Sequence, residues 1–403
     1  MTVIDRDVLD ILRQRCAPEK VRSFARDLNS RERWEKRFAH EKGAGDAARE
    51  RALLDALLTF CTGTLRDEAL TTVLTGVSDH FARKGKPGWA GHLLERAVAG
   101  STAQGGRTHA LALLKRGELL SRQGLWREAA LDLGKALMVF RKLGDADGKA
   151  RVENILGTNA VEQGILKDAI AHFERALSIV GETGAGVLTG TILMNLGIVR
   201  DMLGERDDAL SLYQRARVYF AQAGDSVRLA EVHHNTGMTH LAKGDITRAA
   251  AEFEQSYQLG ARQRNVGIMG LARLGKATVH YQRKDLAVAL RLVDQAMESF
   301  TATNDQLSLA DGYKMKGMIH REMRKFSFAE TYLQTSLRVN QELHNVLNIA
   351  ETYDELGILA RRRSRKEEAL LAFRKAREQY DQLGAREDAA RMTMEIRNLR
   401  NKR

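Results

Sequence analysis

Small residues return every 40 positions along most of this chain, and large apolar residues return between them. One series holds Gly117, Gly157, Gly197, Gly237, Ala277, Gly317 and Gly357. A second series is alanine without exception, at Ala129, Ala169, Ala209, Ala249, Ala289, Ala329 and Ala369. Two more series, of glycine, alanine or serine, run from Ala110 to Ala350 and from Ala136 to Ala376. Several series in one register indicate an internal repeat, which is typical of solenoids.

Each repeat has the pattern of two helices, which we name A and B. The small residues at Ala129 and Ala136 lie two turns apart on one face of helix B. The residue between them is large in every repeat: Leu133, Phe173, Tyr213, Phe253, Val293, Leu333 and Phe373. Small residues let helix axes approach closely, and a large residue fills the remaining space. The pattern therefore predicts antiparallel helix pairs that stack repeat on repeat.

The predicted helix ends carry residues that suit them. Glycine stands at most A–B turns and at several exits from helix B: Gly124, Gly164, Gly204, Gly244, then Gly144, Gly184, Gly224 and Gly384. Glycine adopts the left-handed conformation that ends many helices. Asp145, Asp225 and Asp305 follow the exits from helix B, where a carboxylate can cap the next helix. Only 2 of the 403 residues are proline, which agrees with helices throughout.

The register divides the chain into four parts. Residues 110–389 hold seven 40-residue repeats, and residues 71–109 hold a divergent one. Residues 1–70 form an N-terminal helical segment, which is either degenerate repeats or a separate effector module. Within it, residues 27–62 can be interpreted as a helix pair around Trp34, Gly43 and Ala48. Residues 390–403 are expected to form a capping helix with a basic tail, because terminal repeats need a polar outer face.

These residues resemble the tetratricopeptide repeat, which has small residues at helix A position 8 and helix B positions 20 and 27, with a large residue at position 24. The 40-residue form is similar to the repeats of Pins/LGN-type adaptors and of Rap-type peptide-sensing regulators. Asn195-Leu196-Gly197 and Asn235-Thr236-Gly237 look like the Asn-Leu-Gly core of the adaptors. The resemblance implies an all-α fold, a right-handed α-solenoid of antiparallel helix pairs, and binding of proteins.

The resemblance also implies which residues line the concave surface, namely positions 2, 5, 9, 12 and 13 of each helix A. Candidate partner-binding residues are Asn154, Thr158, Met194, Asn195, Ile198, Met202, His234, Asn235, Met238, Thr278, Tyr281, Lys314, Met318 and Arg321. Methionine suits adaptable binding surfaces. The alternative is that these methionines only fill the contacts between A helices. Tetratricopeptide domains that bind the C-termini of chaperones hold a carboxylate with a lysine at position 5 and an asparagine at position 9. Here Lys314 is the only lysine at position 5, and Met318 stands at its position 9, so this carboxylate clamp is absent.

The chain lacks the common catalytic and nucleotide-binding motifs, and we expect neither an enzyme nor a cofactor. His240, His280 and His320 share position 11, but stacked helices lie about 8–10 Å apart, too far to share one metal ion. We therefore expect no metal site. Cys16 and Cys61 exclude a disulfide scaffold or a Cys-based zinc module. No run of 18 apolar residues could span a membrane, and no signal segment is evident, so a cytoplasmic location is expected.

The net charge of +12 is concentrated at one end of the chain. Residues 121–360 are balanced, whereas residues 361–403 have a clear excess of lysine and arginine. The basic patch at the last A–B turn consists of Arg361, Arg362, Arg363, Arg365 and Lys366. This patch is either solvated surface or a docking site for an acidic protein segment, nucleic acid or anionic lipid. No aromatic residues interleave with it, so nucleic acid is not the expected partner.

Three functions follow from these observations. The favoured one is a non-enzymatic scaffold or adaptor whose concave groove binds a peptide or helix of a partner protein. The alternative is a peptide-responsive, Rap-like signalling regulator in which residues 1–105 act as the effector module. The third is a polyanion-binding protein that uses the basic patch. Self-association through the terminal repeats is compatible with each of them.

Overall fold

The computed structural model of the protein describes residues 6–29, 46–103, 105–181 and 186–401, and over these residues it contains helices and no strands. The all-α prediction is confirmed. Trp34, Gly43 and Gly184 lie outside the described residues, as does the side chain of Ala48. Among the described helices, none combines the length and apolarity needed to cross a bilayer.

The chain divides into two compact units, and the boundary between Val152 and Glu153 falls within a helix. We name residues 1–152 unit 1 and residues 153–403 unit 2. Unit 1 contains α1 (Arg6–Arg13), α2 (Pro18–Asn29), α4 (Asp46–Thr64), α5 (Asp67–Arg83), α6 (Pro87–Ser101), α7 (Gly106–Arg122), α8 (Trp126–Lys142) and the start of α9 (Ala146–Glu162). In unit 1, α5 pairs with α6 and α7 pairs with α8.

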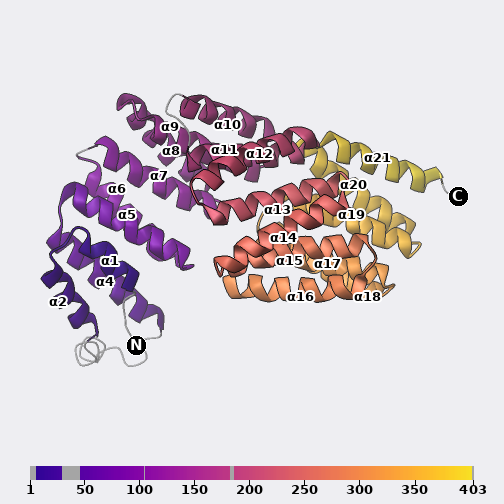
Figure 1. Ribbon diagram of the computed structural model, residues 1–403, viewed down its shortest axis with the longest axis horizontal. Helices are drawn as coiled ribbons and strands as arrows, with labels where there is room; N and C mark the ends of the chain where they lie inside the picture. Colours follow the sequence, from indigo (N-terminus) through magenta and orange to yellow (C-terminus); the bar gives the residue numbers. More distant parts are fainter. Residues whose placement is uncertain (1–5, 30–45, 104, 182–185, 402–403) are drawn as a thin grey trace. The chain divides into compact units, whose positions relative to one another are not determined.

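Unit 2 is a stack of helix pairs (Figure 1). After the end of α9 it contains α10 (Leu166–Gly181), α11 (Val187–Met202), α12 (Arg206–Gln222), α13 (Ser226–Ala242), α14 (Ile246–Arg262), α15 (Val266–Gln282), α16 (Leu286–Thr303), α17 (Gln306–Glu322), α18 (Phe326–Glu342), α19 (Val346–Arg362), α20 (Lys366–Leu383) and α21 (Arg386–Asn401). Odd-numbered helices from α9 onwards are A helices, and even-numbered ones are B helices. Each A helix from α11 to α19 packs against the B helix that follows it and against the next pair.

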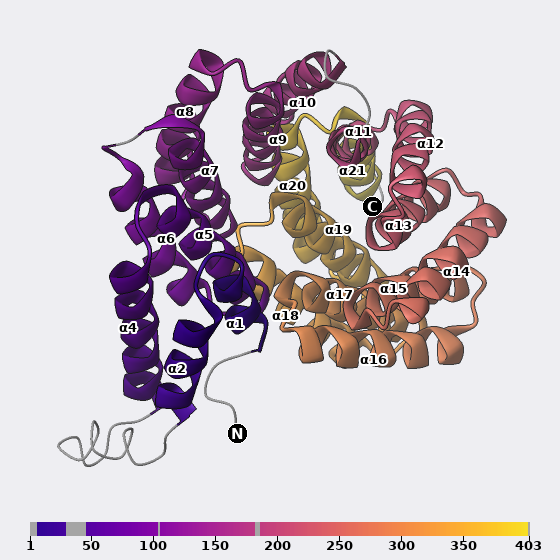
Figure 2. The ribbon, with the colours of Figure 1, turned by 60° about the vertical axis from the view of Figure 1, so that its left-hand side comes forward.

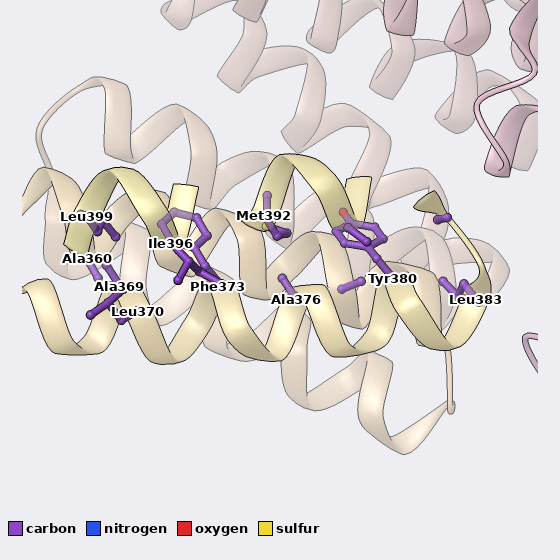
Figure 3. Packing of buried hydrophobic residues seen from close by; sticks show 13 residues of the cluster. Ala360, Ala369, Leu370, Phe373, Ala376, Tyr380, Leu383, Met392, Ile396 and Leu399 are labelled. Carbon is purple, nitrogen blue, oxygen red and sulfur yellow. The ribbon is translucent and has the colours of Figure 1, made fainter. Parts of the chain in front are cut away.

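The large residue of each helix B lies against the glycine of its own helix A, as the repeat pattern predicts. Phe173, Tyr213 and Phe373 are fully buried. A Cβ atom built on Gly157 would lie 2.6 Å from the ring of Phe173, and one built on Gly357 would lie 2.5 Å from the ring of Phe373. Glycine at position 8 is therefore needed for close approach of the two helices. Figure 3 shows this packing at the last repeat, where α21 covers the apolar face of α20 with Met392, Ile396 and Leu399.

Helix ends also follow the sequence pattern. Gly144, Gly224 and Gly384 have positive φ angles. Asp225 caps α13 by accepting a hydrogen bond from the Arg228 backbone N–H at 3.0 Å. Asp145 and Asp305 accept equivalent bonds at the start of α9 and α17. The glycine stops at these three positions and the aspartate starts are thus confirmed, and the aspartates mark where α9, α13 and α17 begin.

Candidate protein-binding surface

The A helices of unit 2 present one side chain per repeat at position 9, along a line of accessible residues. Successive A helices from α11 to α19 contact one another, so their position-9 residues share one surface. Thr158 and Met238 are exposed, and the others are half-buried: Ile198, Thr278 and Met318. The exposed fraction of Met238 is 42%. A large thioether left in contact with water on an otherwise packed helix is a feature of adaptable binding surfaces.

Other candidate residues lie deeper than position 9. Met194 is only 8% exposed and belongs to the core of α11–α13, so it fills the contact between helices. Met202 and Asn235 are half-buried, and Met318 partly packs against the core of α15–α17. Met194 therefore fills a contact between helices, whereas Met238 is the most exposed methionine of the predicted set.

Two asparagines link the first A helices of unit 2. The Asn195 side-chain amide on α11 donates a hydrogen bond to the Asn154 side-chain oxygen on α9, at 3.1 Å. Both side chains are half-buried, and both were predicted to lie on the concave surface. An amide pair of this kind keeps further donor and acceptor groups that can bind the backbone of an extended peptide.

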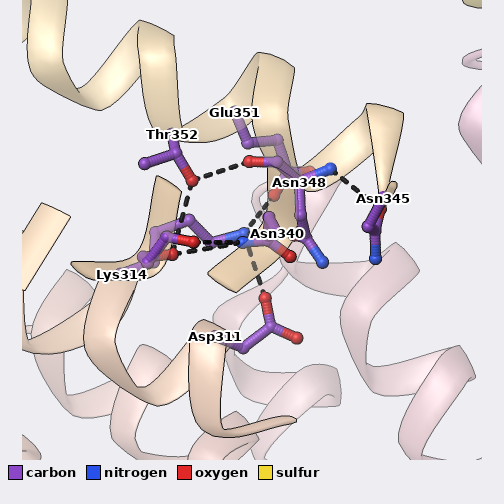
Figure 4. A network of polar contacts seen from close by, with 8 residues as sticks. Asp311, Lys314, Asn340, Asn345, Asn348, Glu351 and Thr352 are labelled. Carbon is purple, nitrogen blue, oxygen red and sulfur yellow. Dashed lines mark hydrogen bonds and ion pairs between the residues drawn. The ribbon is translucent and has the colours of Figure 1, made fainter. Parts of the chain in front are cut away.

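Lys314 lies in a polar network between α17 and α19 (Figure 4). Its ammonium group donates to Asn348 at 2.7 Å, forms an ion pair with Glu351, and lies 3.2 Å from Asp311. Two carboxylates therefore neutralise the one lysine at position 5. A partner would have to displace these internal acids to use Lys314 as an anion site, which is unfavourable for a largely buried group.

Arg321 is neutralised in the same way two turns further along α17. Its guanidinium forms an ion pair with Glu355 on α19 and donates to the Tyr281 hydroxyl on α15 at 3.0 Å. The Arg321 side chain is buried, so this group links three successive A helices rather than facing a partner. Burial raises the pKa of Glu355 above its usual range, although Arg321 opposes the change.

Sequence reasoning missed the acidic partners of these two cations. Glu351 and Glu355 lie at positions 2 and 6 of the next helix A, and the repeat pattern alone does not pair these positions with the preceding repeat. Asp354, at position 5 of the same helix, accepts from Arg391 of α21 at 2.5 Å. The signal was a cation at position 5 or 12 followed 34 to 37 residues later by a carboxylate.

Two carboxyl groups on the earlier A helices lack a direct ion pair in the described part of the chain, although Arg206 acts to lower the pKa of Asp201 and Arg228 acts to lower that of Glu231. Asp201 on α11 and Glu231 on α13 are half-buried and have no ion pair within the described part of the chain. Burial raises the pKa of both carboxyl groups above their usual range. One oxygen of Asp201 is buried without a hydrogen-bond partner. This part of the surface thus favours a positive charge, whereas the α17–α21 part is internally balanced.

The arginines of the basic patch are paired with carboxylates. Arg361 pairs with Glu395, Arg363 with Glu330, and Arg365 with Glu368 at 3.2 Å. Arg362 lies 3.5 Å from Glu322. These four arginines therefore present less free positive charge than the sequence run indicates, which makes the basic patch a weaker site for a polyanion.

Two of the position-11 histidines contact groups of their own helix pair. His320 stacks on Phe328 and Tyr332 of α18, and His280 lies 3.4 Å from Asp285. Across the described ranges, no three His, Cys, Asp or Glu side chains are arranged to hold a metal ion.

His234, the position-5 candidate on α13, should make unit 2 sensitive to acid. Burial lowers its pKa from 6.5 to about 4, and its Nδ1 has no hydrogen-bond partner. The unfolded chain therefore binds a proton that the folded chain does not, and stability falls as pH drops from 6.5 toward 4. The loss from this group is about 2–3 kcal/mol at about pH 4.5.

The measurement is urea unfolding of the wild type and His234→Leu at about pH 7.5 and about pH 4.5. Leucine occupies the same position one repeat later, at Leu274. The other titrating groups are common to both proteins, and their contributions cancel in the difference. On going to the lower pH, the free energy of unfolding of the wild type should therefore fall by about 2–3 kcal/mol more than that of the variant. Equal losses in the two proteins would contradict a buried neutral histidine.

Comparison with known proteins identifies the repeat. The family model described as tetratricopeptide repeat matches residues 148–217, 188–260 and 308–382. A Rap protein complexed with competence and sporulation factor has a similar structure, with a TM-score of 0.57, 13% identity, and coverage of 82% of this chain and 98% of that one. The apo form of RapI is also similar, with a TM-score of 0.50, 12% identity, and coverage of 83% and 98%.

A third similar structure is the Cut9–Hcn1 hetero-tetramer of APC/C, with a TM-score of 0.53, 14% identity, and coverage of 80% of this chain and 55% of that chain. No curated protein matches the chain. At these identities the solved structures show the fold alone. Together with the glycine–aromatic packing and the capped helix pairs, the family match shows that residues 148–260 and 308–382 are tetratricopeptide repeats of an all-α solenoid.

Proposed function

We propose that unit 2 is a non-enzymatic scaffold that holds a peptide or helical segment of a partner protein on its A-helix surface. The observation that carries the proposal is the exposed Met238 in the middle of the position-9 line, between half-buried Ile198 and Thr278. Apolar side chains of a partner can pack there while its backbone meets the Asn154–Asn195 pair.

The charge distribution favours one kind of segment. Asp201 on α11 and Glu231 on α13 both precede Met238 in the chain, and their raised pKa values mean that a nearby cation would stabilise their charged forms. Lys314 and Arg321 already have internal partners. A segment that combines an apolar side chain with lysine or arginine therefore fits α11 and α13 better than an acidic tail does.

The test is a pull-down from the native cell with Met238→Glu. A carboxylate at this exposed site should abolish the apolar contact and lower partner recovery at least about tenfold, because its charge would lose its water against an apolar side chain of the partner. Met138→Glu is the matched control, since Met138 is exposed on helix B of unit 1. Glu231→Gln should weaken recovery less and reduce its salt sensitivity.

Circular dichroism must show that each variant is folded. Recovery of the same partner by folded Met238→Glu at the wild-type level would refute the surface assignment. The double variant Met238→Glu/Met318→Glu should lose the partner as well, but Met318 partly packs in the core, so the single variant is the cleaner test.

A Rap-like regulator is the second proposal. It is supported by the fold shared with two Rap structures. In that proposal residues 1–105 carry the effector function, and occupation of the A-helix surface of unit 2 is the input.

A further inference from the structure

The two edges of the unit 2 solenoid meet. The Nη1 of Arg206, at the A–B turn between α11 and α12, lies 3.0 Å from Glu387 Oε2 at the start of α21. Beside it, Leu383 at the end of α20 lies against Gly164, at the turn between α9 and α10. Figure 2 shows these segments side by side. We name this contact the seam, consisting of Gly164, Gly204, Arg206, Leu383 and Glu387.

The missing side chains of two glycines allow this approach. A Cβ atom on Gly204 would lie 2.7 Å from Glu387 Oε2, and one on Gly164 would lie 3.1 Å from Leu383 Cδ2. The positive φ angle alone does not demand glycine, since Lys284 and Arg324 adopt it at the same turn of later repeats. Gly244 has the same turn with open space around it, so it provides a matched control.

The seam is weaker than the junctions between stacked repeats. Its ion pair joins an arginine side chain that is 27% exposed to a glutamate that is 63% exposed, and exposed pairs contribute little. A hollow of about 650 Å³ remains beside it, lined by Ile165, Leu203 and Gln382 among others. Stacked repeats instead bury whole rings such as Phe253 and Phe373. The seam should therefore open before any repeats separate.

We propose that the seam is a latch, held by Arg206 and Glu387, that opens and closes while the repeats stay stacked. When closed, it joins the A–B turns of the first repeats of unit 2 to the turn between α20 and α21. The helix pairs then surround the A-helix surface. When open, it exposes that surface from the side, so an internal segment of a partner can enter without threading. This role in access rests on the proposed function, whereas the latch itself does not.

The closed state is tested by a cross-link that needs no partner. In Gly204→Cys/Glu387→Cys the two Cβ atoms would lie 3.8 Å apart, which is the mean for a disulfide. Glu387→Cys removes the ion pair with Arg206, so the closed state is reached only transiently, but mild oxidation of the full chain should still link the two cysteines at least about tenfold faster than in the control Gly244→Cys/Glu387→Cys. The native Cys16 and Cys61 are buried. Equal rates in the two variants would overturn the seam.

Opening is tested by spin labels at Lys167→Cys and Gln382→Cys, both exposed beside the seam. Glu387→Lys places two cations together and should raise the ratio of long to short distances at least about fivefold. The charge exchange Arg206→Glu/Glu387→Lys should restore the short distance. Labels at Lys284→Cys and Arg324→Cys, across a stacked junction, should not respond.

An unchanged distance distribution between the seam labels in Glu387→Lys would overturn the latch. A change at both label pairs would overturn it as well, because the stacked repeats themselves would then have separated. Neither measurement involves a partner. A failure of the latch is therefore distinguishable from a failure of the Met238 surface, which only the pull-down reports.

Discussion

Replacing Phe253 by alanine is expected to lower the free energy of unfolding by about 3–5 kcal/mol. Phe253 is fully buried on α14, and its ring fills the space above two glycines of successive A helices. Cβ atoms built on Gly237 and Gly275 would lie 2.7 and 2.4 Å from this ring. Alanine would leave a cavity that the rigid helices cannot close. The cost in stability therefore includes both the lost transfer free energy of the ring and the free energy of the cavity. Urea unfolding followed by far-UV circular dichroism measures the change.

Phe328→Ala is the matched control, because Phe328 is a largely exposed phenylalanine on α18, the helix B two repeats further along. Its loss should cost well under about 1 kcal/mol. Similar costs for the two variants would mean that the ring of Phe253 does not hold successive repeats together. A second transition in the Phe253→Ala curve would support the expectation that each repeat depends on its neighbours.

The fold could be predicted because its main determinants repeat in the sequence. Gly157 and Phe173 reveal a close helix contact only because Gly197 and Tyr213, and Gly357 and Phe373, show the same pairing 40 residues on. The glycine stops and aspartate caps are local signals, which act within one turn of the chain. Neither kind of inference requires knowing how segments far apart in the sequence pack against one another.

The candidate surface could be predicted only in part. Position 9 follows from the repeat register, and Met238 lies where the register placed it. The role of Arg321 could not be read from its own repeat, because burial and Glu355 of the next helix decide it. The seam depends on how far unit 2 curves over several repeats, which is set by small rotations that no single residue specifies.

Arg321→Met is expected to lower the free energy of unfolding by about 3–5 kcal/mol, because it leaves buried Glu355 without its cation. Arg338→Met removes an exposed pair with Glu342 and should cost under about 1 kcal/mol. Arg321→Met/Glu355→Leu should recover most of the loss. Without Arg321, burial raises the pKa of Glu355 further. As pH rises, the folded variant therefore keeps a proton on Glu355 that the unfolded chain has already released, and this lowers its stability. Urea unfolding should therefore show a smaller deficit at about pH 5 than at about pH 7.5, and a pH-independent deficit would contradict this explanation.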